Sequence, residues 1–246
     1  MMDYRDLAAG AARKSPGGAC GENLRSWIRE ARERKDRAYP RGSSAVLIPF
    51  LIRDGAYHVL YEIRAAKLRS QPGEICFPGG RIEAGETPLE TAVREATEEL
   101  CIDRGRIEIV GALDDTIGPG TIPLFTYIAL LHDYQGTRSR AEVDAVFTQP
   151  LDWILANDPE IYRIDLERKM PEDFPYEYVP GGRDYRWREQ FYSVPFYPGL
   201  QTDLSLFEVP RTQKMPVLWG VTARVTHSLA VLLREGTDIQ DLQNRQ

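Results

Sequence analysis

The sequence predicts an α/β fold in which a mixed β-sheet is covered by helices on both faces. The dense apolar run at 45–53 is typical of a buried strand, and an Asp-Gly turn joins it to 57–63 as a β-hairpin. Helical periodicity follows Thr87 and recurs at 221–234, where a closing helix is expected. Strands mixed with helices at these lengths favour a sheet between two helical layers.

The other elements are expected in chain order around these. Residues 23–36 have the pattern of a charged amphipathic helix. Strands are expected near 107–114 and 122–131, with a short strand at 142–149 and a short helix at 150–157.

The stretch 158–216 is rich in aromatic residues, and 176–187, around a Gly-Gly pair, is expected to form a hairpin. One interpretation is a lid or wall that stacks on a base of the substrate. The alternative, which we favour for any single aromatic residue, is an extension with its own small core or a homodimer contact.

The helix after Thr87 begins with clear local signals. Thr87 is a good N-cap, Pro88 fits the first turn, and Glu90 completes a Thr-x-x-Glu capping box. The helix should bury one side, since apolar residues recur at helical spacing. These residues are Leu89, Ala92, Val93, Ala96 and Leu100.

Three glutamates of this helix, Glu95, Glu98 and Glu99, lie at i, i+3 and i+4 and therefore converge on one patch. Most Glu-rich helix faces are simply solvated. Like charges held this close repel one another, however, and a hard divalent cation such as Mg²⁺ is the simplest group to offset them.

The spacing around these glutamates resembles the signature of the Nudix hydrolases, Gly-x5-Glu-x7-Arg-Glu-U-x-Glu-Glu-x-Gly-U, with U a bulky aliphatic residue. Two positions depart from it, because Ala96 is small and Cys101 replaces a glycine that suits a left-handed helix end. The helix either ends there or runs on to Gly105. The matching run is Gly80, five residues, Glu86, seven residues, then Arg94-Glu95-Ala96-Thr97-Glu98-Glu99.

This resemblance implies a Nudix α/β/α sandwich and a Mg²⁺- or Mn²⁺-dependent pyrophosphatase. It makes Glu95 and Glu99 the first metal ligands, with Glu98 a further ligand or the general base. The Gly80 carbonyl is also placed within reach of the metal.

Two further residues of the signature have implied roles. Arg94 is expected to orient a carboxylate of the signature through a bidentate pair. Glu86 either anchors Arg94 or binds metal through water. Some Nudix enzymes take their base from a late loop, which makes Glu142 a second candidate; Asp114 and Asp115 are weaker ones, with turn capping as their ordinary role.

A second pattern resembles the extra motif of the coenzyme A pyrophosphatases, a Nudix subfamily. The later run Leu218-Trp219-Gly220-Val221-Thr222-Ala223 resembles their Trp-Gly-x-Thr-Ala segment. The motif's serine, threonine and histidine are absent, which leaves the substrate preference open. Matching positions are Leu60, Arg64, Arg69, Gly73 and Phe77-Pro78-Gly79-Gly80, and departures are Tyr61, Glu62, Ala65 and Gln71.

The basic run Arg64, Lys67 and Arg69 is a sensible clamp for the phosphates of coenzyme A, unless it is only a solvated loop. With Phe77, these are the expected substrate-binding residues. We therefore expect hydrolysis of coenzyme A or an acyl-CoA. The alternatives are another nucleoside diphosphate derivative (ADP-ribose, NADH or a nucleoside triphosphate) or a nucleotide-binding module without activity, although such modules often lose signature glutamates.

Composition narrows the other possibilities. The chain has 246 residues and a net charge of −6, which argues against general nucleic-acid binding. It has no apolar run of about 18 residues, so no membrane span is expected, and no apolar signal core at its start. Residues 1–42 are rich in Arg, Lys and Ala, as transit peptides are, but the acidic residues Asp3, Asp6 and Glu22 count against that alternative.

The three cysteines have no metal-site spacing, and their odd number suggests no disulfide framework, which fits a reducing cytoplasm. Cys76 is expected to be a packing residue and not a nucleophile. We expect an N-terminal extension at 1–42, partly helical and partly disordered, and a Nudix domain at 43–246 with an aromatic-rich insertion at about 158–216.

Overall fold

The computed structural model describes residues 39–40, 42–113, 116–117, 122–200 and 217–235. The helix predicted at 23–36 and the extension predicted for 1–42 lie almost wholly outside the described residues. Asp114 and Asp115 also lie outside them. None of the helices in the described part of the chain is long and apolar enough to span a membrane.

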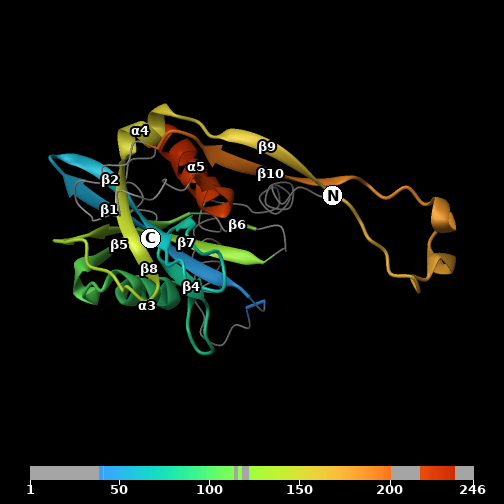
Figure 1. Ribbon diagram of the computed structural model, residues 1–246, viewed down its shortest axis with the longest axis horizontal. Coiled ribbons are helices and arrows are strands. Elements are labelled where there is room, and N and C mark those ends of the chain that lie inside the picture. Colours follow the sequence, from blue (N-terminus) through green and yellow to red (C-terminus); the bar gives the residue numbers. More distant parts are fainter. Residues whose placement is uncertain (1–38, 41, 114–115, 118–121, 201–216, 236–246) are drawn as a thin grey trace, which may run out of the picture.

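The body of the protein is an eight-stranded mixed sheet (Figure 1). β1 pairs antiparallel with β2 and parallel with β7, and β3, β4, β5, β6 and β8 complete the sheet. The mixed sheet predicted from the sequence is thus confirmed. Its strands are β1 (Ser44–Arg53), β2 (Ala56–Arg64), β3 (Ile75–Cys76), β4 (Gly79–Arg81), β5 (Ile107–Ala112), β6 (Thr116–Ile117), β7 (Pro123–Leu131) and β8 (Val143–Pro150).

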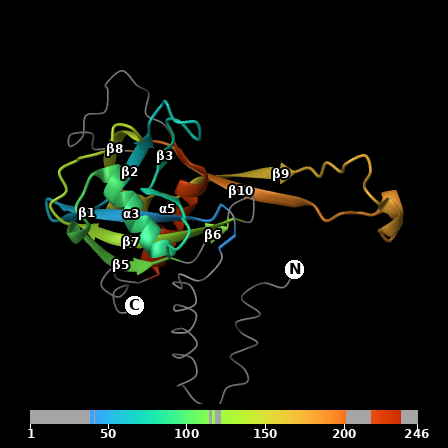
Figure 2. The same ribbon diagram turned by 90° about the horizontal axis from the view of Figure 1, so that it is seen from below.

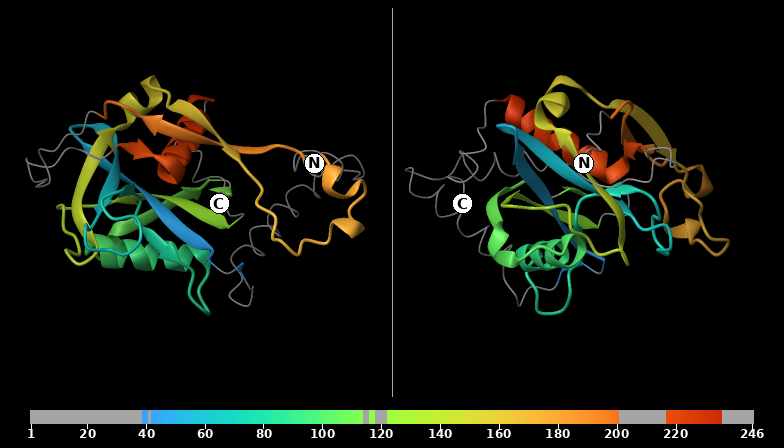
Figure 3. Two further views of the ribbon diagram at one scale, coloured as in Figure 1. Left: turned by 45° about the vertical axis from the view of Figure 1, so that its right-hand side comes forward. Right: turned by 60° about the vertical axis from the view of Figure 1, so that its left-hand side comes forward.

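Helix α3 (Pro88–Leu100) covers one face of the sheet (Figures 1 and 3). Its apolar stripe, which includes Ala92 and Leu100, is buried in one cluster with Leu47 of β1 and Leu60 of β2. The capping box at Thr87 and Glu90 is present as predicted: the Glu90 backbone N–H donates to Thr87 Oγ1 (3.2 Å), and the Thr87 N–H donates to Glu90 Oε2 (3.0 Å).

Helices α4 (Leu151–Ala156) and α5 (Gly220–Arg234) cover the opposite face, which makes the fold the expected α/β/α sandwich. Here Tyr61 of β2 is fully buried and stacks on Phe77 and Phe147, with ring centroids 4.9 and 5.4 Å apart. Its hydroxyl lies 3.0 Å from Thr226 Oγ1 of α5, so the buried phenol keeps a hydrogen-bond partner and ties the helix to the sheet.

A second, three-stranded sheet has the order β11-β10-β9, formed by β9 (Glu160–Leu166), β10 (Gln190–Tyr197) and β11 (Leu218–Trp219). Strands β9 and β10 and the chain between them form an arm that projects away from the body and from α3 (Figures 1 and 2). In this conformation the arm does not lie over α3, as a lid would.

The hairpin predicted at 176–187 is wrong in its placement. The strands of the arm lie on either side of that segment, which instead holds the 3-10 turns η2 (Tyr176–Tyr178) and η3 (Gly182–Asp184). Gly181 and Gly182 both have the positive φ, 85° and 58°, that a tight hairpin turn would use, but Gly182 begins η3 and no strand lies directly on either side of the pair.

Helix α3 ends at Leu100, so the alternative in which it runs on to Gly105 is wrong. Cys101 takes the left-handed conformation (φ 50°) usually given to glycine. The last carbonyls of the helix are satisfied from another segment: Thr137 Oγ1 donates to the Leu100 carbonyl (2.7 Å), and the Ser139 N–H donates to the Glu99 carbonyl (2.8 Å). These non-local bonds fix the end of the helix, and a short 3-10 turn, η1 (Arg104–Arg106), follows.

Replacing Cys101 with glycine should stabilise the protein, since a side chain in the left-handed region costs about 1 kcal/mol. Cys101→Ala is the matched control, because it removes the thiol and keeps the strained Cβ. We expect urea unfolding to give a higher free energy of unfolding for Cys101→Gly than for Cys101→Ala. Equal stability of the two variants would contradict this account of the helix end.

Candidate active site

The glycine loop is fixed against α3 by a hydrogen bond to a buried carboxylate. The backbone N–H of Gly79 donates to Glu99 Oε2 at 2.8 Å. A side chain at Gly79 has no room, because a Cβ there would lie 2.3 Å from the Ala45 carbonyl oxygen of β1. The loop and the helix are therefore held in one arrangement by contacts that only glycine permits.

Gly80 and Glu95, both expected near the metal, also lie against each other. A Cβ on Gly80 would meet Glu95 Oε1 at 2.1 Å, so this carboxylate lies directly against the backbone of the loop. Burial raises the pKa of Glu95, although the neighbouring Arg94 guanidinium lowers it. An anion in this position gains from a cation beside it.

Arg94 orients the carboxylates of the helix. It pairs with Glu86 in bidentate fashion, with Nε 2.7 Å from Oε1 and Nη2 3.2 Å from Oε2. It also reaches Glu95 Oε1 (3.1 Å) and Glu98 Oε2 (3.2 Å). The predicted orienting role of Arg94 therefore agrees with the geometry.

Two roles were predicted for Glu86, anchoring Arg94 or binding metal through water, and its contacts fit the first. Besides Arg94, it accepts a hydrogen bond of 2.7 Å from Thr91 Oγ1. These bonds, with that from Arg94 the largest, lower the pKa of Glu86 to about 2. Because both carboxylate oxygens are engaged, the structure gives no support to Glu86 as a metal ligand.

Glu99 is the most deeply buried of the signature glutamates. Burial raises its pKa to about 7, and repulsion from Glu95 and Glu142 adds to the shift, while the Gly79 N–H and Arg64 oppose it. Glu142 itself is exposed and directly precedes β8, and its carbonyl accepts a 2.8 Å hydrogen bond from the Ala65 N–H. Its negative charge contributes to the raised pKa of Glu95 and of Glu99.

Glu62 is part of this site, and sequence reasoning recorded it only as a departure from a motif. Its side chain is fully buried, and burial followed by repulsion from Glu99 raises its pKa well above the usual range. Glu62 Oε1 has no hydrogen-bond partner among the described residues. The signal that was missed is a lone acid in an otherwise apolar stretch of buried strand. Burial also raises the pKa of the Cys76 thiol beside it, which fits Cys76 as a packing residue.

The predicted substrate-binding residues lie in different environments. Arg64, at the end of β2, is close enough to lower the pKa of both Glu62 and Glu99. Lys67 and Arg69 are both exposed on the loop between β2 and β3, and within the described residues neither has an ion pair with the glutamates. Phe77 was wrongly assigned to the substrate, because its side chain is only 4% exposed and stacks on Tyr61 in the core.

The donor set suits a hard divalent ion, since several carboxylates raise one another's pKa and one buried oxygen lacks a partner. Among the described residues, however, no three Asp, Glu, His or Cys side chains are positioned to coordinate an ion in their present conformations. Glu98, for example, is turned toward Arg94. Glutamate side chains would therefore have to change rotamer for a metal to bind.

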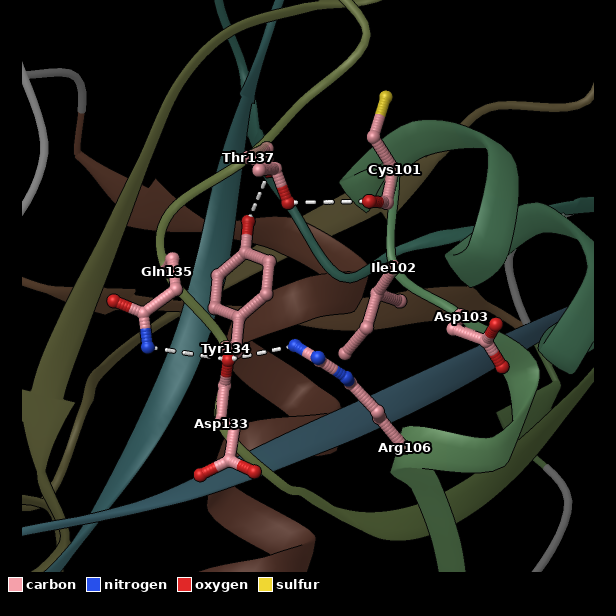
Figure 4. Close-up of a pocket in the computed structure, with 8 residues that line it drawn as sticks. All are labelled: Cys101, Ile102, Asp103, Arg106, Asp133, Tyr134, Gln135 and Thr137. Atoms are coloured by element: carbon pink, nitrogen blue, oxygen red, sulfur yellow. Dashed lines mark hydrogen bonds between the residues drawn. The ribbon is translucent and has the colours of Figure 1, made fainter.

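A pocket of about 450 Å³ lies at the C-terminal end of α3 and contains none of the signature glutamates (Figure 4). Within it, the Tyr134 hydroxyl donates to the Thr137 carbonyl, and Arg106 Nη1 donates to the Asp133 carbonyl at 3.2 Å. The Arg106 bond joins the loop after β7 to the turn that follows the helix, and the Tyr134 bond lies within that loop, so the hollow belongs to the support of the helix end.

Comparison with known proteins gives the family. Residues 43–168 match the family model of the NUDIX domain. The chain is 34% identical over 120 residues to the peroxisomal coenzyme A diphosphatase NUDT7 of Mus musculus, covering 48% of this chain and 50% of that protein. It therefore spans about half the length of this curated relative. It is also 30% identical over 174 residues to the uncharacterized Nudix hydrolase NudL of Enterobacter sp. (strain 638), covering 68% of this chain and 82% of that one.

Among solved structures, the chain resembles the Nudix hydrolase RenU of M. smegmatis with a TM-score of 0.41 and 24% identity. The match covers 49% of this chain and 77% of that chain.

The two glycines of the loop should respond differently to alanine. Gly79→Ala should cost about 1–3 kcal/mol of stability, because its Cβ meets rigid backbone. Gly80→Ala meets only the flexible end of Glu95, so it should cost much less stability and yet lower Mn²⁺ affinity at least ~10-fold by displacing that carboxylate. Urea unfolding and calorimetric Mn²⁺ titration measure the two effects. Wild-type Mn²⁺ affinity in Gly80→Ala would exclude Glu95 as a ligand.

Glu99 should make metal-free stability depend on pH. Its pKa rises from 4.5 to about 7 on folding, so the stability due to its protonated form is complete below 4.5 and is lost as the pH rises through 7. Glu99→Gln keeps an acceptor for the Gly79 N–H without the charge. It should melt above wild type at about pH 8 in EDTA, with the gap closing near pH 4.5. A lower melting temperature for Glu99→Gln than for wild type at about pH 8 would show that the charge of Glu99 does not destabilise the fold.

Proposed function

The chain belongs to the Nudix hydrolase family, whose members act on phosphorus anhydrides, and we propose that it cleaves the diphosphate linkage of coenzyme A or an acyl-CoA. The oxygen of water would form a bond to one phosphorus, and the bridging oxygen would leave with the other phosphate. The products are adenosine 3′,5′-bisphosphate and 4′-phosphopantetheine or its acylated form.

The observation that carries this proposal is the position of Arg64. This arginine belongs to the coenzyme A motif, and it lies at the end of β2, where its charge acts on Glu62 and Glu99. A guanidinium beside the signature carboxylates suits a phosphate of the substrate next to the metal. The likeness to a protein named a coenzyme A diphosphatase supports the same substrate class.

Glu95, Glu98, Glu99 and the Gly80 carbonyl are the residues that would hold Mg²⁺ or Mn²⁺. When bound, such an ion offsets negative charge on the phosphates and lowers the pKa of water. Arg94 keeps the helix carboxylates in place through Glu86.

A proton must leave the attacking water. Glu142 is exposed, lies beside the helix glutamates and is free to accept the proton on a carboxylate oxygen, which makes it our candidate base. Glu98 is the other candidate, and its pairing with Arg94 at 3.2 Å would have to loosen for it to take this role.

The residues of the motif leave the acyl group open. Glu62 and Ala65 stand where the subfamily motif has threonine and serine, and both are buried, so neither defines an acyl-binding contact. The cytoplasm and a homodimer stay predictions from the sequence.

Incubation with coenzyme A and Mn²⁺ should release the two phosphorylated fragments named above, identified by mass spectrometry. Glu98→Gln, Glu99→Gln and Glu142→Gln separate the roles. The first two should lower turnover at least ~10²-fold through lost charge positioning, with a loss of Mn²⁺ affinity for Glu99→Gln. Glu142→Gln should lower turnover similarly but leave Mn²⁺ affinity unchanged, as expected for a base.

ADP-ribose, NADH and nucleoside triphosphates serve as comparison substrates in the same assay. Intact coenzyme A together with cleavage of one of these would reject the substrate and keep the family chemistry. Saturable binding of coenzyme A with no cleavage of any compound in the panel would instead indicate a nucleotide-binding module.

A further inference from the structure

Strand β9 is an open edge. It is the last strand of the sheet β11-β10-β9, and within the described residues only β10 pairs with it. All seven of its residues are exposed, and the arm that carries it projects from the body (Figure 2). An isolated two-stranded ribbon is marginally stable, and an open edge presents unpaired backbone N–H and C=O groups to another strand.

This edge is also unusually apolar for an exposed strand. Ile161, Tyr162, Ile164 and Leu166 are 58%, 55%, 42% and 40% exposed. Three of them alternate along the strand and therefore share one face.

The apolar face continues across the sheet. Tyr162 packs edge-to-face on Phe196 of β10, and Phe196 stacks on Trp219 of β11, with ring centroids 5.4 and 5.7 Å apart. The stripe thus runs over three strands and stops, still exposed, at the outer edge of β9. Exposed apolar surface of this kind commonly marks an interaction site.

We infer that β9 pairs antiparallel with β9 of a second copy of this chain, around a two-fold axis at Ile164. In this register Ile164 faces its own counterpart, and Tyr162 faces Leu166 of the second copy, twice by symmetry. Arg163 faces Asp165 of the second copy, also twice. One step beyond the strand, Glu160 faces Arg168. Apolar pairs therefore meet at the axis, and opposite charges meet on either side of it.

The neighbouring registers are worse. Centring the axis on Arg163 or on Asp165 would place two like charges directly opposite each other, which is destabilising. Centring it on Leu166 would set Asp165 against Glu167. The order of charges on β9 is thus self-complementary in one register. This self-complementarity argues for pairing with a second copy of the chain and not with an unrelated strand.

The charged side chains of β9 are exposed and can change partner to pair with those of a second copy. Arg163 Nε lies 2.6 Å from Asp165 Oδ1 of its own strand, with the two side chains 52% and 74% exposed. Exposed pairs of this kind contribute little, so changing partner costs little. Backbone hydrogen bonds and the apolar stripe would supply the affinity, and the charges would set the register. Charged residues on an edge can also prevent pairing, but like charges would do so better than this alternation.

Sedimentation velocity over a range of concentrations tests the inference on the full chain. Wild type should show a reversible monomer–dimer equilibrium, and Ile164→Lys should raise the dissociation constant at least ~10-fold, because two lysines would face each other at the axis. Tyr178→Ser is the matched control, since Tyr178 is 81% exposed on η2 and outside β9, and it should leave the equilibrium unchanged. Circular dichroism confirms that each variant is folded.

Mixing two charge variants makes the test specific for the register. Asp165→Arg and Arg163→Asp each place like charges across the axis, so each should be largely monomeric alone. Mixed together they should form a heterodimer, since both cross-strand pairs between positions 163 and 165 then join opposite charges. Repair within one chain cannot explain such recovery, because each chain keeps its own like-charged pair. A monomeric wild type at all concentrations, or a mixture that stays monomeric, would overturn the inference.

Discussion

The candidate site depends on one hydrogen bond, from the backbone N–H of Gly79 to the carboxylate of Glu99. It joins the glycine loop, which pairs with β1, to the helix that carries the acidic residues. The bond can form because Gly79 has no side chain to meet the Ala45 carbonyl oxygen. It also requires the Glu99 carboxylate, which is buried beside the loop. A single backbone donor does not compensate a buried carboxylate, and the raised pKa of Glu99 expresses that deficit. The same deficit makes the site attractive to a cation.

The parts of the fold that sequence reasoning predicted are those set by local chemistry. The start of α3 follows from Thr87 and Glu90, three residues apart, and the β1–β2 hairpin follows from its turn. The Arg94–Glu86 pair lies within one motif, and the resemblance to the Nudix signature implied it as one of two roles for Glu86. In each case the residues that decide the structure are neighbours in the chain, so no knowledge of tertiary packing is needed.

The errors came where distant segments decide. The end of α3 is set by Thr137 and Ser139, which lie beyond β7, so the sequence left open whether the helix ends at Cys101 or runs on to Gly105. Glu62 joins the site only because β2 and α3 meet across the sheet. Phe77 lies in a motif associated with substrate, yet its ring completes the stack with Tyr61. Membership of a motif therefore identifies a position without saying whether its side chain faces the ligand or the core.

The two ends of strand β10 in the arm lie in different environments, one buried and one exposed. At its base, Tyr197 of β10 is buried and packs on Trp153 of α4, and the Ser193 carbonyl accepts a hydrogen bond from Arg224 of α5. Toward its far end, Phe191 of the same strand is more than half exposed. The body therefore accounts for the apolar residues near it and leaves those of β9 unexplained. Since α3 lies away from the arm, the substrate site does not account for them either, and contact with another strand remains the explanation that fits both their alternation and the order of their charges.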